Sequence, residues 1–480
     1  MAHQPRPAGT DCTARAVPGV SAEPADTAAT ANSRRARLDA YLKARSTPAG
    51  PRREAPIPVR GDRGPAPLSF GQEGIWRKAQ SVSSRTLYNE TITIHRHGPL
   101  QVAALQRGLD EIVRRHEAWR TTFHGRDGDV VQRVEPWVPV PIPVHDLRGL
   151  PEEKRLPEAL RLAAEDARLP FDLTRGPLFR PRLVHLDDQE HKLFMAVHQI
   201  LLDGVSVYRV LMPELAALYD AYAARLPSPL PQLPIQVSDF AAWQRRWLSG
   251  EVLAEQLAYW DGTLAAPPEP LRWPADRSRP PEQTYGGAIH PFALPPELGA
   301  GLRALAGREG VTLFVTFLAA FTRLLHRYTG QTDLVIGTPS PAGRKRSEVQ
   351  GLLGYFLNPV ALRMDLSRGP TFRQLLAQGR QVVAEAVGHD DVPFERLVDR
   401  SCGAGDPSRH PLFTVAISQE PPLPDLGPAW DLTPMDVTSG GARWDLYLVL
   451  DDRKERGILG RVQYNPDIFE AQAIERFLAD

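Results

Sequence analysis

The segment of the chain with the clearest chemical potential is AVHQILLDGVS at 196–206. It predicts a strand that carries His198 and Gln199 to its end, a three-residue connection, and a helix that begins at Asp203 and Gly204. Asp203 or Ser206 can cap that helix, because each side-chain oxygen can accept a hydrogen bond from a free amide of the first turn. Glycine at position 204 lets a substrate or another part of the backbone approach closely.

The residues alone leave two interpretations of the histidine in this segment open. An imidazole can transfer protons near neutral pH, but a histidine next to a helix cap is more often a hydrogen-bonded structural residue. Successive strand residues point to opposite faces of a sheet, so only one of His198 and Gln199 should face a given cavity. Glutamine can donate and accept hydrogen bonds but cannot take up a proton near neutral pH.

The elements that must position these residues alternate between strands and helices, which predicts an α/β fold. Strands that pair through a polar turn are expected at 179–186 and 191–200, and a helix at 206–222 with a kink or a restart at Pro213. Further strands are expected at 88–95, 333–339 and 355–363, and further helices at 99–116, 311–327 and 371–387.

Composition separates a leader from a folded body. Residues 1–65 hold eleven Lys or Arg against six Asp or Glu, and we expect a disordered linker with one short helix at 33–46 that could dock a partner. A spacer without a binding partner is an equal alternative for this leader. Proline-rich passages then place a lobe boundary near 235, so we predict one lobe at 66–235 and a second at 236–480.

Several classes of function are disfavoured by composition. Lys and Arg together number 57, as do Asp and Glu, so no net charge attracts nucleic acid. Cys12 and Cys402 lack neighbours at zinc spacing, and no metal site is predicted. The sequence shows neither a signal peptide nor an apolar run of membrane-spanning length, so we expect a cytoplasmic protein without membrane contact.

The 196–206 segment resembles the HHxxxDG signature of the condensation domains of non-ribosomal peptide synthetases, which belong to the chloramphenicol acetyltransferase-like superfamily. Here the signature reads HQILLDG. Six other segments resemble family motifs and occur in the family order: LSFGQEGIW (68–76), RHEAWRTTF (115–123), VSDFAAWQ (237–244), IGTPSPAGRKRSEVQGLLGYFLNPVALR (336–363), HDDVPFERLV (389–398) and DPSRHPLFTV (406–415). An ordered series over most of the chain is far more specific than one motif.

The resemblance implies two chloramphenicol acetyltransferase-like lobes in a V shape with a central tunnel. Donor and acceptor carrier proteins would insert their phosphopantetheine arms from opposite ends, and the acceptor amine would attack the donor thioester. It implies no cofactor bound by the domain itself. Because the leader at Met1 precedes the body and the chain stops at Asp480 soon after the last family strand, we also expect an N-terminal domain of a longer synthetase subunit. An adenylation domain would follow it in the same polypeptide, and a separate protein would deliver the donor.

The resemblance assigns roles to individual residues. His198 matches the first histidine of the signature, and Gln199 stands where the family has the histidine that deprotonates or orients the attacking amine. Asp203 matches the structural aspartate, and Arg344 is its expected ion-pair partner. The remaining matches are Gly204 and Ser206 beside the signature, Tyr355 and Asn358 in the tunnel-lining segment, and Arg120 as a support.

Three functions remain open because of Gln199. The first is an amide-forming acyltransferase, weakened by the missing histidine and helped by the proximity of tethered substrates. The second is a catalytically inactive domain that docks carrier proteins or tailoring enzymes. The third is a free-standing acyltransferase. Relatives that recruit a cytochrome also alter the Asp-Gly pair, which is intact here at Asp203 and Gly204.

Overall fold

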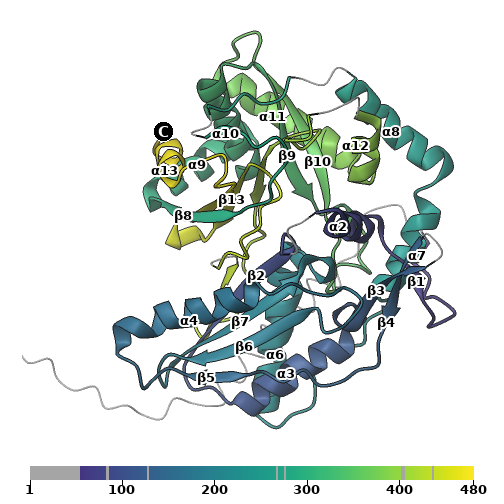
Figure 1. The fold of residues 1–480 in the computed structure, drawn as a ribbon, viewed down its shortest axis with the longest axis vertical. Helices are drawn as coiled ribbons and strands as arrows, with labels where there is room; N and C mark the ends of the chain where they lie inside the picture. Colours follow the sequence, from purple (N-terminus) through teal and green to yellow (C-terminus); the bar gives the residue numbers. More distant parts are fainter. Residues whose placement is uncertain are drawn as a thin grey trace, which may run out of the picture. The chain divides into compact units, whose positions relative to one another are not determined.

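The computed structural model describes residues 55–82, 86–126, 129–265, 269–274, 277–401, 406–434 and 437–480 (Figure 1). The predicted helix at 33–46 and both cysteines lie outside the described residues. The chain divides into two units, Met1–Ala44 and Arg45–Asp480, and all the described elements belong to the second unit. At the start of this unit, Ile57 is buried and its amide donates to Glu348, so the end of the predicted linker packs on the body.

The first large sheet has five strands and carries the 196–206 segment. Its order is β12 (Trp430–Pro434), β2 (Asn89–His97), β7 (Glu190–His198), β6 (Phe179–His185) and β5 (Val144–Asp146). Every pair is antiparallel except β5 with β6. The central strand β7 is buried along almost its whole length because it pairs on both sides and is covered on both faces.

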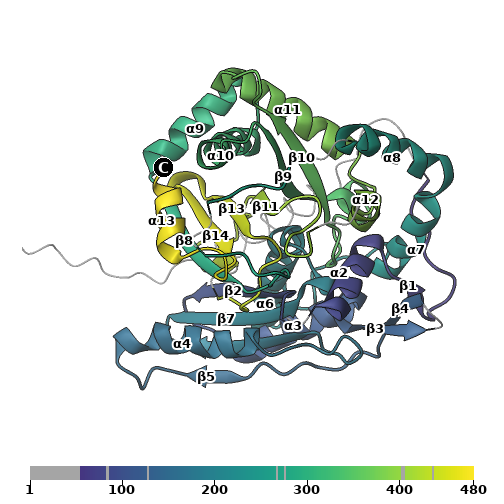
Figure 2. The same cartoon turned by 45° about the horizontal axis from the view of Figure 1, so that its top comes forward.

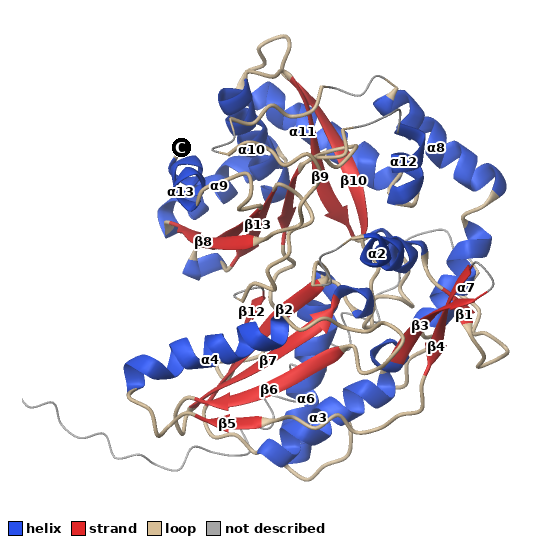
Figure 3. Ribbon diagram, in the orientation of Figure 1, coloured by secondary structure: helices blue, strands red, loops and turns tan. Residues whose placement is uncertain are grey.

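Helices cover both faces of this sheet (Figures 1 and 3). One face packs against α3 (Val102–Arg115) and α6 (Met212–Ala223), and the other packs against α4 (Glu152–Ala167). Alternation along β7 explains this, since Met195 and Val197 enter the α3 and α6 core while Phe194 enters the α4 core.

The second large sheet has six strands in the order β10 (Asn358–Asp365), β9 (Asp333–Ser340), β11 (Val415–Gln419), β13 (Leu446–Asp452), β14 (Ile458–Tyr464) and β8 (Ala288–Leu294). Strand β11 runs parallel to both of its neighbours. The helices that accompany this sheet are α9 (Pro296–Glu309), α10 (Leu313–Thr329), α11 (Phe372–Gly388), α12 (Phe394–Ser401) and α13 (Ala471–Ala479) (Figure 2).

The remaining described elements include a small third sheet and three further helices. A small sheet holds β1 (Ala66–Pro67), β4 (Asp129–Val134) and β3 (Thr121–Arg126). The other helices are α2 (Phe70–Ser81), α7 (Val237–Trp247) and α8 (Gly250–Leu264). No single described helix is long and apolar enough to cross a bilayer, and α9 with α10 meets that test only as a pair bent by 105°.

The two halves of the sequence do not separate cleanly between the two sheets. Strand β12 comes from the second half but pairs with β2, and Phe356 and Val237 also join the core of the first sheet. The lobe boundary at 235 and 236 therefore stays a prediction. The α/β class and the alternating elements are confirmed, with three local differences that affect the site.

The first difference is that β7 ends at His198, and Gln199–Leu201 form a 3-10 turn, η2, instead of continuing the strand. The second is that β10 begins at Asn358 instead of 355, because the Phe356 amide is bound to a side chain. The third is the helix after the signature, which contains a π-helical segment, η3 (Val207–Leu211), before Pro213.

Trp430 tests the contribution of β12 to the first core. Its ring is buried and lies edge-on to Tyr219, with ring centroids 5.4 Å apart. We expect Trp430→Ala to lower the free energy of unfolding by about 3–5 kcal/mol, because it leaves a cavity. Chemical denaturation measures this, and Trp137→Ala at an exposed position is the control. Equal effects of the two variants would contradict the role of β12.

Candidate active site

His198 is the last residue of β7 and lies opposite Asn89 of β2. Its Nδ1 atom accepts a hydrogen bond from the Ile200 amide at 3.3 Å, and its ring packs edge-on against Phe171. Burial lowers the pKa of the imidazole to about 3, so the ring is neutral near pH 7. His198 therefore shapes the turn that follows it, on the sheet face that α4 covers.

Gln199 begins the η2 turn and is buried, with 5% of its surface exposed. Its amide donates to the Tyr88 carbonyl at 2.8 Å, and its own carbonyl accepts from the Leu202 amide. The side-chain Oε1 atom is buried and has no hydrogen-bond partner among the described residues. An unsatisfied buried acceptor costs about 1–3 kcal/mol, so a ligand that brings an N–H group to this oxygen would remove that penalty.

Asp203 accepts four hydrogen bonds, which use both of its carboxylate oxygens. Its Oδ1 accepts from the Ser206 amide at 2.6 Å and from Arg344 at 3.1 Å. Its Oδ2 accepts from Arg344 at 3.3 Å and from the Phe356 amide at 2.9 Å. Both members of the ion pair are buried, so the expected partners are in contact and Asp203 serves the protein instead of a substrate.

Ser206 extends this connection. Its hydroxyl donates to the Gly354 carbonyl at 2.8 Å and accepts from the Gly354 amide and from Arg344. Arg344 also donates to the Leu352 carbonyl and lies over the Phe356 ring. The start of the signature helix is thereby attached to residues 352–356, which come from the second half of the chain.

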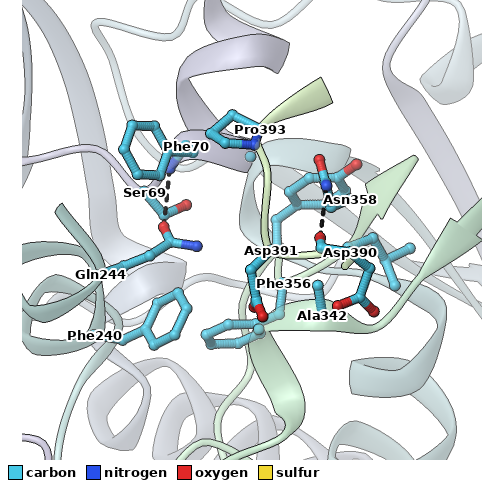
Figure 4. A pocket seen from close by; sticks show the side chains of 14 residues that line it. Ser69, Phe70, Phe240, Gln244, Ala342, Phe356, Asn358, Asp390, Asp391 and Pro393 are labelled. Carbon is cyan, nitrogen blue, oxygen red and sulfur yellow. Dashed lines mark hydrogen bonds between the residues drawn. The ribbon is translucent and has the colours of Figure 1, made fainter. Parts of the chain in front are cut away.

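Asn358 stabilises a neighbouring loop. Its amide group donates to the Asp390 and Val392 carbonyls at 2.8 and 2.6 Å, and its Oδ1 accepts from the Phe394 amide. The side chain is thus occupied by bonds to the polypeptide. Figure 4 shows it at the edge of a small hollow that Phe240 and Phe356 also line.

The other two predicted site residues, Tyr355 and Arg120, differ in their distance from the signature segment. Tyr355 is buried beside Phe356, and burial raises the pKa of its phenol. Arg120 donates to the Glu135 carbonyl and to Glu117, and none of its described contacts involves 198–206. The structure brings His198 through Ser206, Arg344 and Tyr355 together, whereas Arg120 supports the small sheet.

Glu420 is a site residue that the sequence analysis missed. A Cβ atom at Gly204 would lie only 3.0 Å from the Glu420 Oε2 atom, so the glycine makes room for this carboxylate. Glu420 follows β11 directly, and its Oε1 accepts from Arg461 at 2.7 Å. No motif surrounds Glu420 in the sequence, and only the folded chain places it beside the signature.

A family model described as Condensation domain matches residues 62–480, and the chain therefore belongs to the condensation domain family. One of the linear gramicidin synthase proteins from Brevibacillus parabrevis is 42% identical over 88% of this chain, which covers 5% of that protein. Phosphinothricin tripeptide synthetase PhsC from Streptomyces viridochromogenes is 40% identical over 94% of this chain and 41% of that protein. The chain thus spans less than half the length of these relatives.

Solved structures agree with this assignment. The X-domain from teicoplanin biosynthesis is 29% identical, with a TM-score of 0.75 over 88% of this chain and 95% of that one. The first condensation domain of the CDA synthetase has a TM-score of 0.77 at 23% identity, over 86% of this chain and 95% of that one, which shows a shared fold. These neighbours have the two-lobe fold of the chloramphenicol acetyltransferase-like class.

The Asp203–Arg344 pair should be essential for folding. We expect Asp203→Ala to lower the free energy of unfolding by about 3–5 kcal/mol, because it leaves the buried Arg344 guanidinium without its counter-charge. Arg400→Ala is the control, since it removes an ion pair with Asp261 that is about half exposed. The control should leave the denaturation midpoint unchanged, and an equally stable Asp203→Ala would contradict the assignment.

Glu395 supplies a pH-dependent contribution to stability. It lies near the start of α12 against Gly74 of α2, and burial, with help from Glu73, raises the pKa of its carboxyl from 4.5 to about 7. Because the folded state holds this proton more tightly than the unfolded state, the contribution is full below about pH 4.5. It is lost as the pH rises through 7.

We expect Glu395→Gln to raise the thermal unfolding midpoint relative to wild type more at pH 8 than at pH 4, because the amide never has to ionise inside the protein. Thermal denaturation at both pH values measures the difference. The control is Glu309→Gln, whose carboxylate pairs with exposed Arg373 at the surface. A midpoint difference for Glu395→Gln that does not grow with pH would contradict the raised pKa.

Proposed function

We propose that this chain is a condensation domain of a non-ribosomal peptide synthetase or of a hybrid polyketide and peptide synthetase. It transfers an acyl or peptidyl group from a carrier-bound thioester to the amine of a carrier-bound acceptor. Its partners are the donor and acceptor carrier proteins, with a downstream adenylation domain in the same polypeptide. The phosphopantetheine arms belong to the carriers, and the thioester they bear supplies the leaving group.

The proposal rests on the hydrogen bonding of the signature loop, residues 198–206. Asp203 is fully engaged by Arg344 and by the Ser206 and Phe356 amides, so the loop is held in place. Gln199 Oε1, in contrast, is buried and unpartnered among the described residues. An acceptor amine is an N–H donor of the kind that this oxygen lacks. We propose that Gln199 orients the amine, and that His198 keeps the turn in shape.

Rate enhancement then depends mainly on position. Holding two tethered reactants in a productive geometry can lower a barrier by about 7–11 kcal/mol. A general base contributes about 10²–10⁴-fold, and a carboxamide cannot act as one near neutral pH. With glutamine at position 199, we therefore expect the domain to catalyse amide formation, but slowly.

A docking role is the second candidate. The teicoplanin X-domain, at 29% identity, has also been solved in a complex with OxyB. A chain of this fold that binds carriers or a tailoring enzyme without forming product would fit that precedent. The intact Asp203–Gly204 pair and the unpartnered Gln199 acceptor, judged among the described residues, favour the enzyme.

The decisive experiment loads one carrier with an acyl thioester and another with an aminoacyl thioester. Intact-protein mass spectrometry follows the amide product with and without this chain. We expect product above the carrier-only background, and a rise in kcat for Gln199→His of about 10–10²-fold with little change in KM for either carrier. Carrier binding without product, by both wild type and Gln199→His, would instead support the docking role.

A further inference from the structure

Glu420 brings a carboxylate from the end of a second-sheet strand to the backbone of the signature. Its amide donates to the Leu450 carbonyl at 2.7 Å, which joins it to β13, next to β11 in the second sheet (Figure 2). Its Oε2 faces Gly204, where any larger residue would press a Cβ atom to 3.0 Å from this oxygen. Gln199 and Gly204 bracket one tight loop, because the Gln199 carbonyl accepts from the Leu202 amide and Asp203 caps the helix.

The two oxygens of this carboxylate have different surroundings. Oε1 accepts from Arg461 at 2.7 Å, whereas Oε2 lies against Gly204. The Glu420 side chain retains 14% of its surface exposed, so protein encloses most of the group without sealing it off completely. Arg461 thus holds Oε1, while Oε2 is directed at the signature loop.

We propose that Glu420 is the proton acceptor for the attacking amine in this chain and takes the part that Gln199 cannot perform. The inference rests on the proposed function. As the amine nitrogen bonds to the thioester carbon, its proton passes to Glu420 Oε2. When the tetrahedral intermediate collapses, the C–S bond breaks and Glu420 returns the proton to the departing thiolate. The proton and the charge are therefore both accounted for without any further reactant.

The electrostatic surroundings suit a base that works near neutral pH. Burial raises the pKa of the Glu420 carboxyl above its ordinary value, and the nearby carboxylates add to the rise, whereas Arg461 opposes it. A carboxylate of ordinary pKa would be a weak proton acceptor, so this direction favours transfer. The titratable and charged groups around Glu420 are Arg461 on β14, Asp451 and Tyr447 on β13, Tyr208 on η3 and Glu90 on β2.

The primary test is Glu420→Gln, which preserves the shape of the side chain and removes its basicity. With loaded carriers at pH 7, we expect kcat to fall about 10²–10⁴-fold while KM for both carriers changes little. In wild type, kcat should rise with pH as the Glu420 carboxyl loses its proton. This rise in the pH profile should be absent from the Glu420→Gln variant. An unchanged kcat, or an unchanged pH profile, would overturn the proposal.

Rescue separates a proton acceptor from a structural carboxylate. In the Glu420→Gln background, Gln199→His should raise kcat by at least about tenfold more than it does in wild type, because the imidazole then takes the proton that position 420 no longer accepts. A purely structural role for Glu420 predicts the same rise in kcat from Gln199→His in both backgrounds, and that result would overturn the proposal. No product from wild type, Gln199→His or the double variant would instead refute the condensation function itself.

The matched control is Asp445→Asn, which also removes a buried carboxylate held by an arginine, Arg279, in the same half of the chain. We expect it to lower the thermal unfolding midpoint as Glu420→Gln does, and to leave kcat per folded molecule and the pH profile unchanged. Equal losses of kcat in both variants would show that lost stability explains the effect, and would overturn the proposal.

Discussion

Asp203 and Arg344 are 141 residues apart in the chain, and the buried ion pair between them is the constraint on which the rest of the site depends. An unpaired charge in this environment would be costly, so each residue forces the other to its position. Through this pair and Ser206, the start of the signature helix is bound to residues 352–356. The backbone around Phe356 consequently leaves the strand pattern and donates to Asp203.

Because Asp203 is used for structure, the chemistry must come from other groups. His198 is buried and neutral, and the lone pair of its Nδ1 atom is used by the Ile200 amide. Gln199 offers an acceptor without basicity. Glu420 is a carboxylate that approaches the loop where a glycine leaves room for it. With Glu420 as the proton acceptor, residues from distant parts of the sequence divide the work: holding the signature loop, orienting the amine and taking its proton.

Much of the fold could be predicted from local patterns. The strands around 88–95 and 191–200 and the helices at 99–116 and 371–387 follow from apolar spacing, and the structure has them. The errors occur where a tertiary contact overrides the local pattern. The strand expected to reach Ile200 ends at His198, since the Ile200 amide binds the His198 ring and the Leu202 amide binds the Gln199 carbonyl, which closes a turn. At Pro213, where the sequence predicts a kink or a restarted helix, a π-helical segment is followed by a new regular helix from Met212, because the proline nitrogen cannot donate within a helix.

The sequence by itself determined the α/β class, because that rests on local periodicity, and its ordered series of motifs determined the resemblance to condensation domains. The pairing of Asp203 with Arg344 was what that resemblance implied, and the structure has it. Only the tertiary structure decided which polar atoms remain available. Whether Gln199 Oε1 is satisfied, or Glu420 lies near Gly204, depends on contacts between residues that are far apart in the chain. Such contacts leave no periodic trace in the sequence, because a single side chain at the end of a strand carries each of them.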